Sequence, residues 1–225
     1  KVNKYIGGPL VILLLPLAWL FDGAARLRVW MYRFGYLKSH RPSWPTLSIG
    51  NISAGGTGKT PLLFSALKWF AENSAEAAVL SRGYGGDEGV LLRQRFPQLS
   101  LIENPDRVAG MRELSAKHKP EILVLDDGFQ HRFVARQMDL VLIDARRPLA
   151  GERLLPGGRL REPLSSLARA TDVLVTHATH VVPELADQIR ATHGRPPVAW
   201  CNHVWTGLAR FDGDGHTAIP VTAID

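Results

Sequence analysis

The segment from Ser53 to Thr60 constrains the fold of this chain more than any other. It reads Ser-Ala-Gly-Gly-Thr-Gly-Lys-Thr and lies between an apolar, strand-like run at Thr46–Gly50 and a helix-like pattern at Lys59–Ala71. A glycine-rich turn in that context lets backbone N–H groups converge on phosphate oxygens, and the helix N-terminus adds partial positive charge. We therefore predict a phosphate-binding loop. Its lysine reaches the β- and γ-phosphates of a nucleotide, and its last threonine binds Mg²⁺.

Two interpretations of this loop follow from the residues alone. Ser53 replaces the glycine that usually opens such a loop. A glycine-rich turn without a ligand is the alternative, but the Gly-Lys-Thr ending and the flanking strand and helix favour phosphate binding. The predicted nucleotide-binding residues are Ser53, Ala54, Gly55, Gly56, Thr57, Gly58, Lys59 and Thr60.

Strand-like and helix-like patterns alternate along the rest of the chain. Further helices are expected at Asp106–His118 and Pro183–His193, where aspartate and proline are typical of helix N-termini. Several strands are apolar throughout, as parallel strands covered on both faces are. We therefore predict an α/β fold of the P-loop NTPase type, with a doubly wound, mostly parallel sheet and an N-terminal membrane-anchor helix. The expected strands are Thr46–Gly50, Ala77–Ser81, Ile122–Leu125, Leu140–Ile143 and Val173–Thr176.

Acidic residues end the strand expected at Ile122–Leu125. Asp126 and Asp127 follow it directly, and ligands of open α/β sheets bind at the carboxyl ends of strands. Because a strand-end aspartate commonly completes the Mg²⁺ site of phosphate-loop enzymes, both are candidate metal ligands. A helix cap or a turn is the alternative for the pair, and we favour that role for Asp144 after the next strand.

Two charged segments are candidates for transfer chemistry. Asp87 follows the glycine-rich Ser81–Gly86; a carboxylate there can act as a general base toward a hydroxyl group, and an exposed loop acid is the alternative. Arg161 and Glu162 follow the proline- and glycine-rich Leu155–Gly158. Arginine stabilises charge on a transferring phosphoryl group and glutamate can complete a metal shell, although a solvated turn fits the composition equally well.

The chain between Tyr5 and Phe21 is apolar and uncharged, and arginines follow it. Its length is at the short end of the roughly 17–25 residues that cross a bilayer. Trp30 and Phe34 come next among basic residues, a combination typical of a membrane–water interface. We expect a membrane anchor that spans the bilayer or lies in one leaflet. A buried core helix and a cleaved signal peptide are the alternatives.

Composition narrows the classes of partner. The net charge of +6 suits an anionic membrane, a phosphorylated substrate or nucleic acid. We expect no nucleic-acid partner, because basic and aromatic residues are interleaved only in the N-terminal region. The single cysteine, Cys201, excludes an intrachain disulfide and fits a reducing compartment. Nothing in the sequence indicates an oligomeric state.

Four motifs, in this order, resemble the tetraacyldisaccharide 4'-kinases of lipid A synthesis. They are Gly50–Pro61, Ser81–Gly85, Asp126–His131 and Leu155–Pro163, and the resemblance extends to about Thr176. The string Asp-Asp-Gly-Phe-Gln-His is unusual enough to be specific, which the phosphate loop alone is not. The resemblance implies transfer of the γ-phosphate of ATP to the 4'-hydroxyl of an acylated glucosamine disaccharide 1-phosphate, a membrane lipid, on the cytoplasmic face of the inner membrane.

Residue roles and domain boundaries follow from the same resemblance. Asp87 would be the carboxylate that draws the proton from the hydroxyl group. We expect a membrane-anchor segment over 1–40, a phosphate-loop nucleotide-binding kinase domain over 41–195 and the start of a C-terminal lobe over 196–225. The other implied catalytic residues are Lys59 and Arg161, and the implied ligands of Mg²⁺ are Thr60, Asp126, Asp127 and Glu162.

Two departures from the family pattern bear on activity. Asp87 follows the Ser81–Gly85 loop almost at once, where the family has a longer segment and a proline. The family's C-terminal strand, and the histidine thought to pair with its catalytic aspartate, have no counterpart in the chain. We therefore expect nucleotide binding with weak or no turnover. Two alternatives remain: an ATPase switch of the partitioning or metallocentre-assembly type, which usually has lysine in place of Ala54, and a membrane-tethered nucleotide-binding scaffold.

Overall fold

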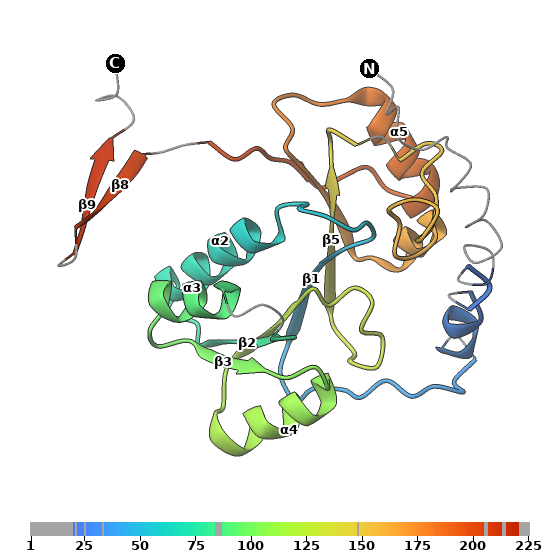
Figure 1. Ribbon diagram of the computed structural model, residues 1–225. Helices are drawn as coiled ribbons and strands as arrows, with labels where there is room; N and C mark the ends of the chain where they lie inside the picture. Colours follow the sequence, from blue (N-terminus) through green and yellow to red (C-terminus); the bar gives the residue numbers. More distant parts are fainter. Residues whose placement is uncertain are drawn as a thin grey trace.

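Seven parallel strands form one sheet at the centre of the fold (Figure 1). The computed structural model describes residues 20, 22–24, 26–32, 34–83, 87–147, 149–204, 207–212 and 215–220. The strand order is β3-β2-β4-β1-β5-β6-β7, so β4 and β5 lie on either side of β1. The strands are β1 Thr46–Asn51, β2 Ala77–Ser81, β3 Ser100–Glu103, β4 Ile122–Asp126, β5 Met138–Asp144, β6 Asp172–Thr176 and β7 Ala199–Trp200.

Helices cover both faces of this sheet. Successive side chains of a strand point to opposite faces. On β4, Val124 therefore packs in the same buried cluster as α2 and α3, whereas Leu123 and Leu125 pack with α4 on the other face. On β5 and β6, a third cluster packs against α5 and a short 3-10 helix, η1. The helices are α2 Lys59–Glu72, α3 Asp87–Arg95, α4 Arg107–Lys117, η1 Leu164–Arg169 and α5 Pro183–His193.

The predicted doubly wound, parallel α/β architecture is confirmed. Apart from the N-terminal anchor helix, every strand and helix expected from the sequence is present, with ends that differ by one or two residues at most. Asp106 caps α4 as expected, since its carboxylate accepts hydrogen bonds from the backbone N–H groups of Val108 and Ala109 at 2.9 and 3.1 Å. The sequence pattern missed α3, β3, η1, the short β7 and the hairpin strands β8 and β9.

The structure does not test the domain boundaries that were predicted near the two ends of the chain. Of the expected anchor at Tyr5–Phe21, only residue 20 is described. No helix within the described ranges is long and apolar enough to cross a bilayer. In the expected C-terminal segment, β7 extends the main sheet by pairing with β6, and β8 Gly207–Asp212 pairs with β9 Gly215–Pro220 in an antiparallel hairpin. The division at residues 40 and 195 stays a prediction.

Candidate nucleotide-binding site

The predicted phosphate loop connects β1 to α2 at the carboxyl edge of the sheet. Two of its glycines have left-handed backbone conformations, with φ of 108° at Gly55 and 81° at Gly58. Other residues rarely adopt these angles, so both positions require glycine. Gly58 is followed at once by the first turn of α2, which begins at Lys59. Among the described residues, no atom lies within 4 Å of the place that a Cβ atom at Gly56 would take, so this part of the loop opens onto space that a phosphate group can occupy.

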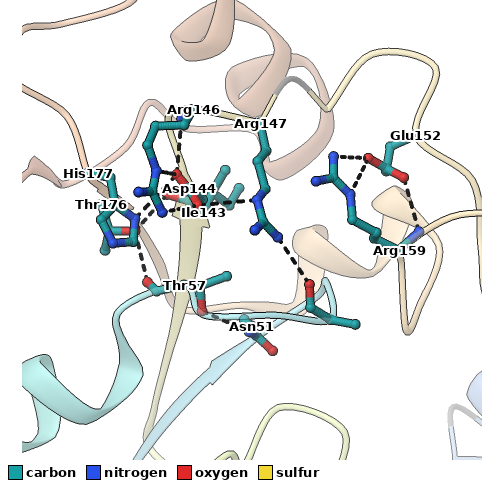
Figure 2. Close-up of polar contacts among 11 residues, drawn as sticks. Asn51, Thr57, Ile143, Asp144, Arg146, Arg147, Glu152, Arg159, Thr176 and His177 are labelled. Atoms are coloured by element: carbon teal, nitrogen blue, oxygen red, sulfur yellow. Dashed lines mark hydrogen bonds and ion pairs between the residues drawn. The ribbon is translucent and has the colours of Figure 1, made fainter. Parts of the chain in front are cut away.

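Buried hydrogen bonds hold the loop from below. The Asn51 side chain donates from Nδ2 to Oγ1 of Thr57 at 2.7 Å, and Thr176 at the end of β6 donates from Oγ1 to the Thr57 carbonyl oxygen at 2.8 Å (Figure 2). Asn51 and Thr57 are fully buried, and Thr176 is nearly so. Because buried polar groups are costly to leave unpaired, these bonds fix the loop before a nucleotide binds.

A later segment of the chain pairs with the entry to the loop. The Ala54 N–H donates to the Arg159 carbonyl and the Arg161 N–H donates to the Ile52 carbonyl, each at 2.7 Å. Ser53 and Leu160 form an antiparallel bridge between these two segments. The motif Leu155–Pro163, which contains the candidate residue Arg161, therefore lies directly beside the phosphate loop.

Three of the predicted site residues meet at the end of β4. Asp127 lies 3.5 Å from Nζ of Lys59 and 2.7 Å from a terminal nitrogen of Arg161. Burial alone would raise the pKa of Asp127, but the charges of the two cations and their hydrogen bonds outweigh it and hold the pKa below its usual value. Its φ of 50° is left-handed, a conformation that aspartate tolerates better than most residues. Asp127 is therefore held as an anion between two cations.

Asp126 belongs to a cluster of carboxylates at the same sheet edge. Burial raises its pKa to about 6, and the nearby carboxylates of Glu88 and Asp127 add to the rise. Glu88 also accepts a hydrogen bond from the hydroxyl group of Thr60 at 2.9 Å. The predicted metal ligands Thr60, Asp126 and Asp127 are thus brought to one place, together with Glu88.

The chemistry of this cluster fits a hard divalent cation. Clustered carboxylates and a hydroxyl are the oxygen ligands that Mg²⁺ prefers. Oδ1 of Asp127 is buried, and among the described residues its one polar contact is the long ion pair with Lys59 at 3.5 Å. In the described part of the chain, no group of three or more His, Cys, Asp or Glu side chains could by itself hold a metal. A Mg²⁺ ion bound with ATP needs only one or two protein ligands, because the phosphates supply others.

Glu162, the fourth predicted metal ligand, has a different partner in the structure. Its carboxylate accepts a hydrogen bond from the Arg169 guanidinium at 2.7 Å, and only 10% of its side chain is exposed. The same guanidinium lies 3.4 Å from the ring centroid of Phe129 and donates to that residue's carbonyl at 2.9 Å. This pairing supports the turn after β4, so metal binding by Glu162 stays a prediction.

Comparison with known proteins identifies the family. A family model described as tetraacyldisaccharide-1-P 4'-kinase matches residues 10–88 and 85–219. The chain belongs to the tetraacyldisaccharide-1-P 4'-kinase family. The tetraacyldisaccharide 4'-kinase of Syntrophotalea carbinolica is 36% identical over 85% of this chain and 58% of that protein. That of Chlorobium phaeovibrioides is 37% identical over 84% of this chain and 61% of that protein.

The fold has a counterpart in the same family. The crystal structure of LpxK from Aquifex aeolicus in complex with ATP has a TM-score of 0.68 and 23% sequence identity, and the match covers 86% of this chain and 82% of that one. The chain spans about 60% of the length of the two curated tetraacyldisaccharide 4'-kinases named above. Membership in this family places the chain outside the partitioning and metallocentre-assembly ATPases that its loop also resembles.

Within this 4'-kinase fold, Asp87 is not in a loop. The alternative of an exposed loop acid was wrong about the backbone, because Asp87 is the first residue of α3. The sequence pattern missed this helix because its apolar and polar residues show little helical periodicity, and because Gly89 interrupts it. The side chain of Asp87 lies outside the described part of the structure. Its neighbour Glu88 contacts Thr60, so α3 begins beside the predicted metal ligands.

The sequence reasoning also missed a polar group on the other flank of the loop. Asp144, interpreted as a turn residue, ends β5 with a side chain that is only 1% exposed, and it pairs with Arg146, Arg147 and His177 (Figure 2). Burial would raise the pKa of Asp144, but the hydrogen bonds from Arg146 lower it below its usual value. The signal was available, because β5 neighbours β1 and polar residues at the carboxyl ends of such strands face the ligand.

Proposed function

We propose that this chain is an ATP-dependent lipid kinase and catalyses the step of lipid A synthesis for which its relatives are named. The reaction is transfer of the γ-phosphate of ATP to the 4'-hydroxyl of a tetraacylated glucosamine disaccharide 1-phosphate. Support comes from the names of the relatives, which are 36% and 37% identical over most of this chain. The chain itself supplies a phosphate loop in the required context between a strand and a helix.

The observation that carries the proposal is the meeting of Lys59, Asp127 and Arg161 beside the loop. Lys59 starts α2, so its ammonium can reach the β- and γ-phosphates while Asp127 holds it at 3.5 Å. Arg161 is oriented by the same carboxylate at 2.7 Å and can stabilise negative charge on the transferring group. When bound, Mg²⁺ would neutralise part of the negative charge on the phosphates. Thr60, Asp126 and Asp127 are the residues that would hold it.

Asp87 is the proposed general base. Asp87 directly precedes Glu88 at the start of α3. Glu88 is hydrogen-bonded to the predicted metal ligand Thr60 at 2.9 Å, so the backbone of Asp87 lies close to that ligand. A carboxylate at this position can accept the proton of an acceptor hydroxyl that approaches the γ-phosphate. Both the loop and the start of α3 lie at the carboxyl edge of the sheet, where ligands of this fold class bind.

We also propose that the N-terminal region rests on the cytoplasmic face of the inner membrane. Trp30, Phe34 and Tyr36 are 46%, 61% and 68% exposed, and the Trp30 ring stacks on the Tyr36 ring at 5.3 Å. Exposed aromatic rings among arginines favour a lipid headgroup region. A terminal nitrogen of Arg28 donates to the Gln130 carbonyl at 3.3 Å, which connects this region to the turn after Asp126 and Asp127. The lipid substrate would thus meet the site at the membrane surface.

Transfer of label from ATP to lipid tests the enzymatic proposal. The 225-residue chain is incubated with γ-labelled ATP, Mg²⁺ and a tetraacylated disaccharide 1-phosphate in detergent. The full-length Syntrophotalea carbinolica relative serves as the positive control for the lipid and the detergent. We expect the chain to bind ATP and to label the lipid weakly, and Lys59→Ala and Asp87→Asn to abolish the label. Hydrolysis of ATP without labelled lipid, while the relative labels it, would contradict the proposal.

Sedimentation with vesicles tests the membrane proposal separately. We expect binding to vesicles that contain anionic phospholipid, with weaker binding at high salt. Replacing Trp30, Phe34 and Tyr36 with serine should reduce that binding. Replacing the exposed Trp69, which is on α2, should leave it unchanged. If both variants bind the vesicles equally well, the exposed rings do not support the membrane proposal.

A further inference from the structure

Arg147 approaches the phosphate loop from the flank opposite Asp127. It follows β5, whereas Asp127 follows β4, and these strands lie on the two sides of β1. The loop continues directly from β1. A cation after β5 therefore borders the loop on one side, as Lys59 and Arg161 do with Asp127 on the other.

The Arg147 side chain is fixed at its base by a buried anion. Its Nε lies 3.5 Å from Oδ2 of Asp144, and the Asp144 side chain is 1% exposed. Asp144 is itself held by the Arg146 backbone N–H at 3.0 Å and by Nδ1 of His177 at 3.3 Å. Figure 2 shows Arg147 extending from this group toward the loop. The guanidinium is thus positioned by contacts that are present before any nucleotide binds.

The far end of Arg147 lies against the first half of the loop. A terminal nitrogen, Nη1, lies 3.5 Å from the Ala54 carbonyl oxygen. A Cβ atom at Gly55 would lie only 2.7 Å from the same nitrogen, so the guanidinium takes the space that a side chain at Gly55 would fill. The Arg147 side chain is 35% exposed. Its two contacts are long for charge-assisted hydrogen bonds, which leaves a fork of five N–H donors with capacity for another acceptor.

That acceptor has a predictable chemistry. The helix end of a phosphate loop, with its converging N–H groups, cradles the inner phosphates, so the outer phosphate lies toward the first half of the loop. Some phosphate-loop enzymes place an arginine of their own chain at this outer phosphate, and others borrow one from a partner. The Ala54 side chain is uncharged. The positive charge beside the Ala54 carbonyl comes instead from the guanidinium of Arg147, which follows β5.

We propose that Arg147 contacts the γ-phosphate of bound ATP and stabilises its charge during transfer, with Asp144 as the residue that positions it. The inference rests on the proposed nucleotide-binding function. In the transfer, the acceptor hydroxyl oxygen forms a bond to the γ-phosphorus, and the bond from that phosphorus to the bridging oxygen breaks with its electron pair leaving on ADP. The hydroxyl proton passes to Asp87. Arg147 gains and loses no proton.

Comparison of ATP and ADP binding tests the proposal without relying on turnover. Titration calorimetry gives the Kd of each nucleotide, with Mg²⁺ present, for the 225-residue chain. Arg147→Ala should weaken ATP binding by about 10-fold or more, as expected for loss of a hydrogen bond to a charged group, and change ADP binding by less than about twofold. Arg147→Lys keeps the charge but not the fork, and it should show a smaller loss confined to ATP.

Arg159→Ala is the matched control. Arg159 is also beside the loop, but its guanidinium is paired with Glu152 at 2.6 Å (Figure 2). Its replacement therefore removes a nearby positive charge and leaves the proposed contact between Arg147 and the γ-phosphate in place. We expect it to change the ratio of the two Kd values little. Equal losses for ATP and ADP in both Arg147 variants would show that Arg147 only braces the loop, and unchanged ATP binding would also overturn the proposal. A wild-type chain that binds neither nucleotide would refute the proposed function itself, a result distinct from binding without preference.

Discussion

Replacing Thr57 with valine should weaken the fold through a single buried hydrogen bond. The Thr57 hydroxyl accepts from Nδ2 of Asn51 at 2.7 Å, and both residues are 0% exposed. Valine has nearly the same shape as threonine, so no cavity forms, but the Asn51 donor loses its acceptor in a place that water does not reach. The hydrogen bond from the Thr176 hydroxyl to the Thr57 carbonyl at 2.8 Å does not need the Thr57 side chain and should persist.

The size of the effect follows from the cost of an unpaired buried donor, about 1–3 kcal/mol. We expect the free energy of unfolding to fall by that amount in urea titrations, with an unchanged dependence on urea concentration. Thr57→Ser keeps the hydroxyl and loses one methyl group, which costs about 1 kcal/mol. ATP affinity should fall in the valine variant as well, because the loop is then less firmly fixed.

A double-mutant cycle separates the hydrogen bond from other effects. In an Asn51→Ala background the donor is absent, so Thr57→Val should cost little beyond the first change, and the coupling energy should be about 1 kcal/mol or more. If Thr57→Val alone lies within about 0.5 kcal/mol of the wild type, the assignment of this bond as a support of the loop is wrong.

Three further changes should have distinct signatures. Gly50→Ala should lower the free energy of unfolding by about 1–3 kcal/mol, measured in urea, because its Cβ would lie 2.7 Å from the Phe129 backbone nitrogen. Burial holds the pKa of His131 at about 4, so stability should fall as the pH drops from about 6.5 toward 4, and His131→Gln should flatten that dependence in pH-resolved thermal melts. Asp127→Asn suits the left-handed φ of 50° but removes the anion between Lys59 and Arg161, and it should weaken ATP binding about 10-fold in Mg²⁺ and much less in EDTA by calorimetry.

Much of the sheet could be predicted from the sequence because most of its strands consist mainly of apolar residues. The runs at Ala77–Ser81 and Ile122–Leu125 are apolar or nearly so, as parallel strands buried on both faces require. The helix at Pro183–His193 carried its own start signal and was predicted with both ends correct. In these segments, local pattern and tertiary burial favour the same structure.

The missed elements depend on contacts that local pattern does not encode. β3 Ser100–Glu103 is a four-residue edge strand that exists through its pairing with β2. α3 has weak helical periodicity and packs through Leu92 into the cluster that it shares with α2. Its start nevertheless fixes the backbone of Asp87, the proposed base.

The candidate site, like the fold, could be predicted only where a local motif indicates its residues. The phosphate loop could be found by its motif, and the strand-end rule indicated Asp126 and Asp127. The approach of Arg147 to Gly55 could not be predicted, because the two residues are far apart in the chain. The ion pair between Glu162 and Arg169 spans only seven residues, but it depends on η1, which the sequence pattern missed.

The bonds around the phosphate loop also set an order of events during protein synthesis. The loop at residues 53–60 leaves the ribosome early. Its partners, the Arg159 carbonyl and the Thr176 hydroxyl, are made about a hundred residues later. At roughly 5–20 residues per second, the loop waits several seconds or longer for them. A nascent chain that ends before Thr176 should therefore retain nucleotide poorly. Cellular ATP should assist the folding of this domain only after β6 has emerged.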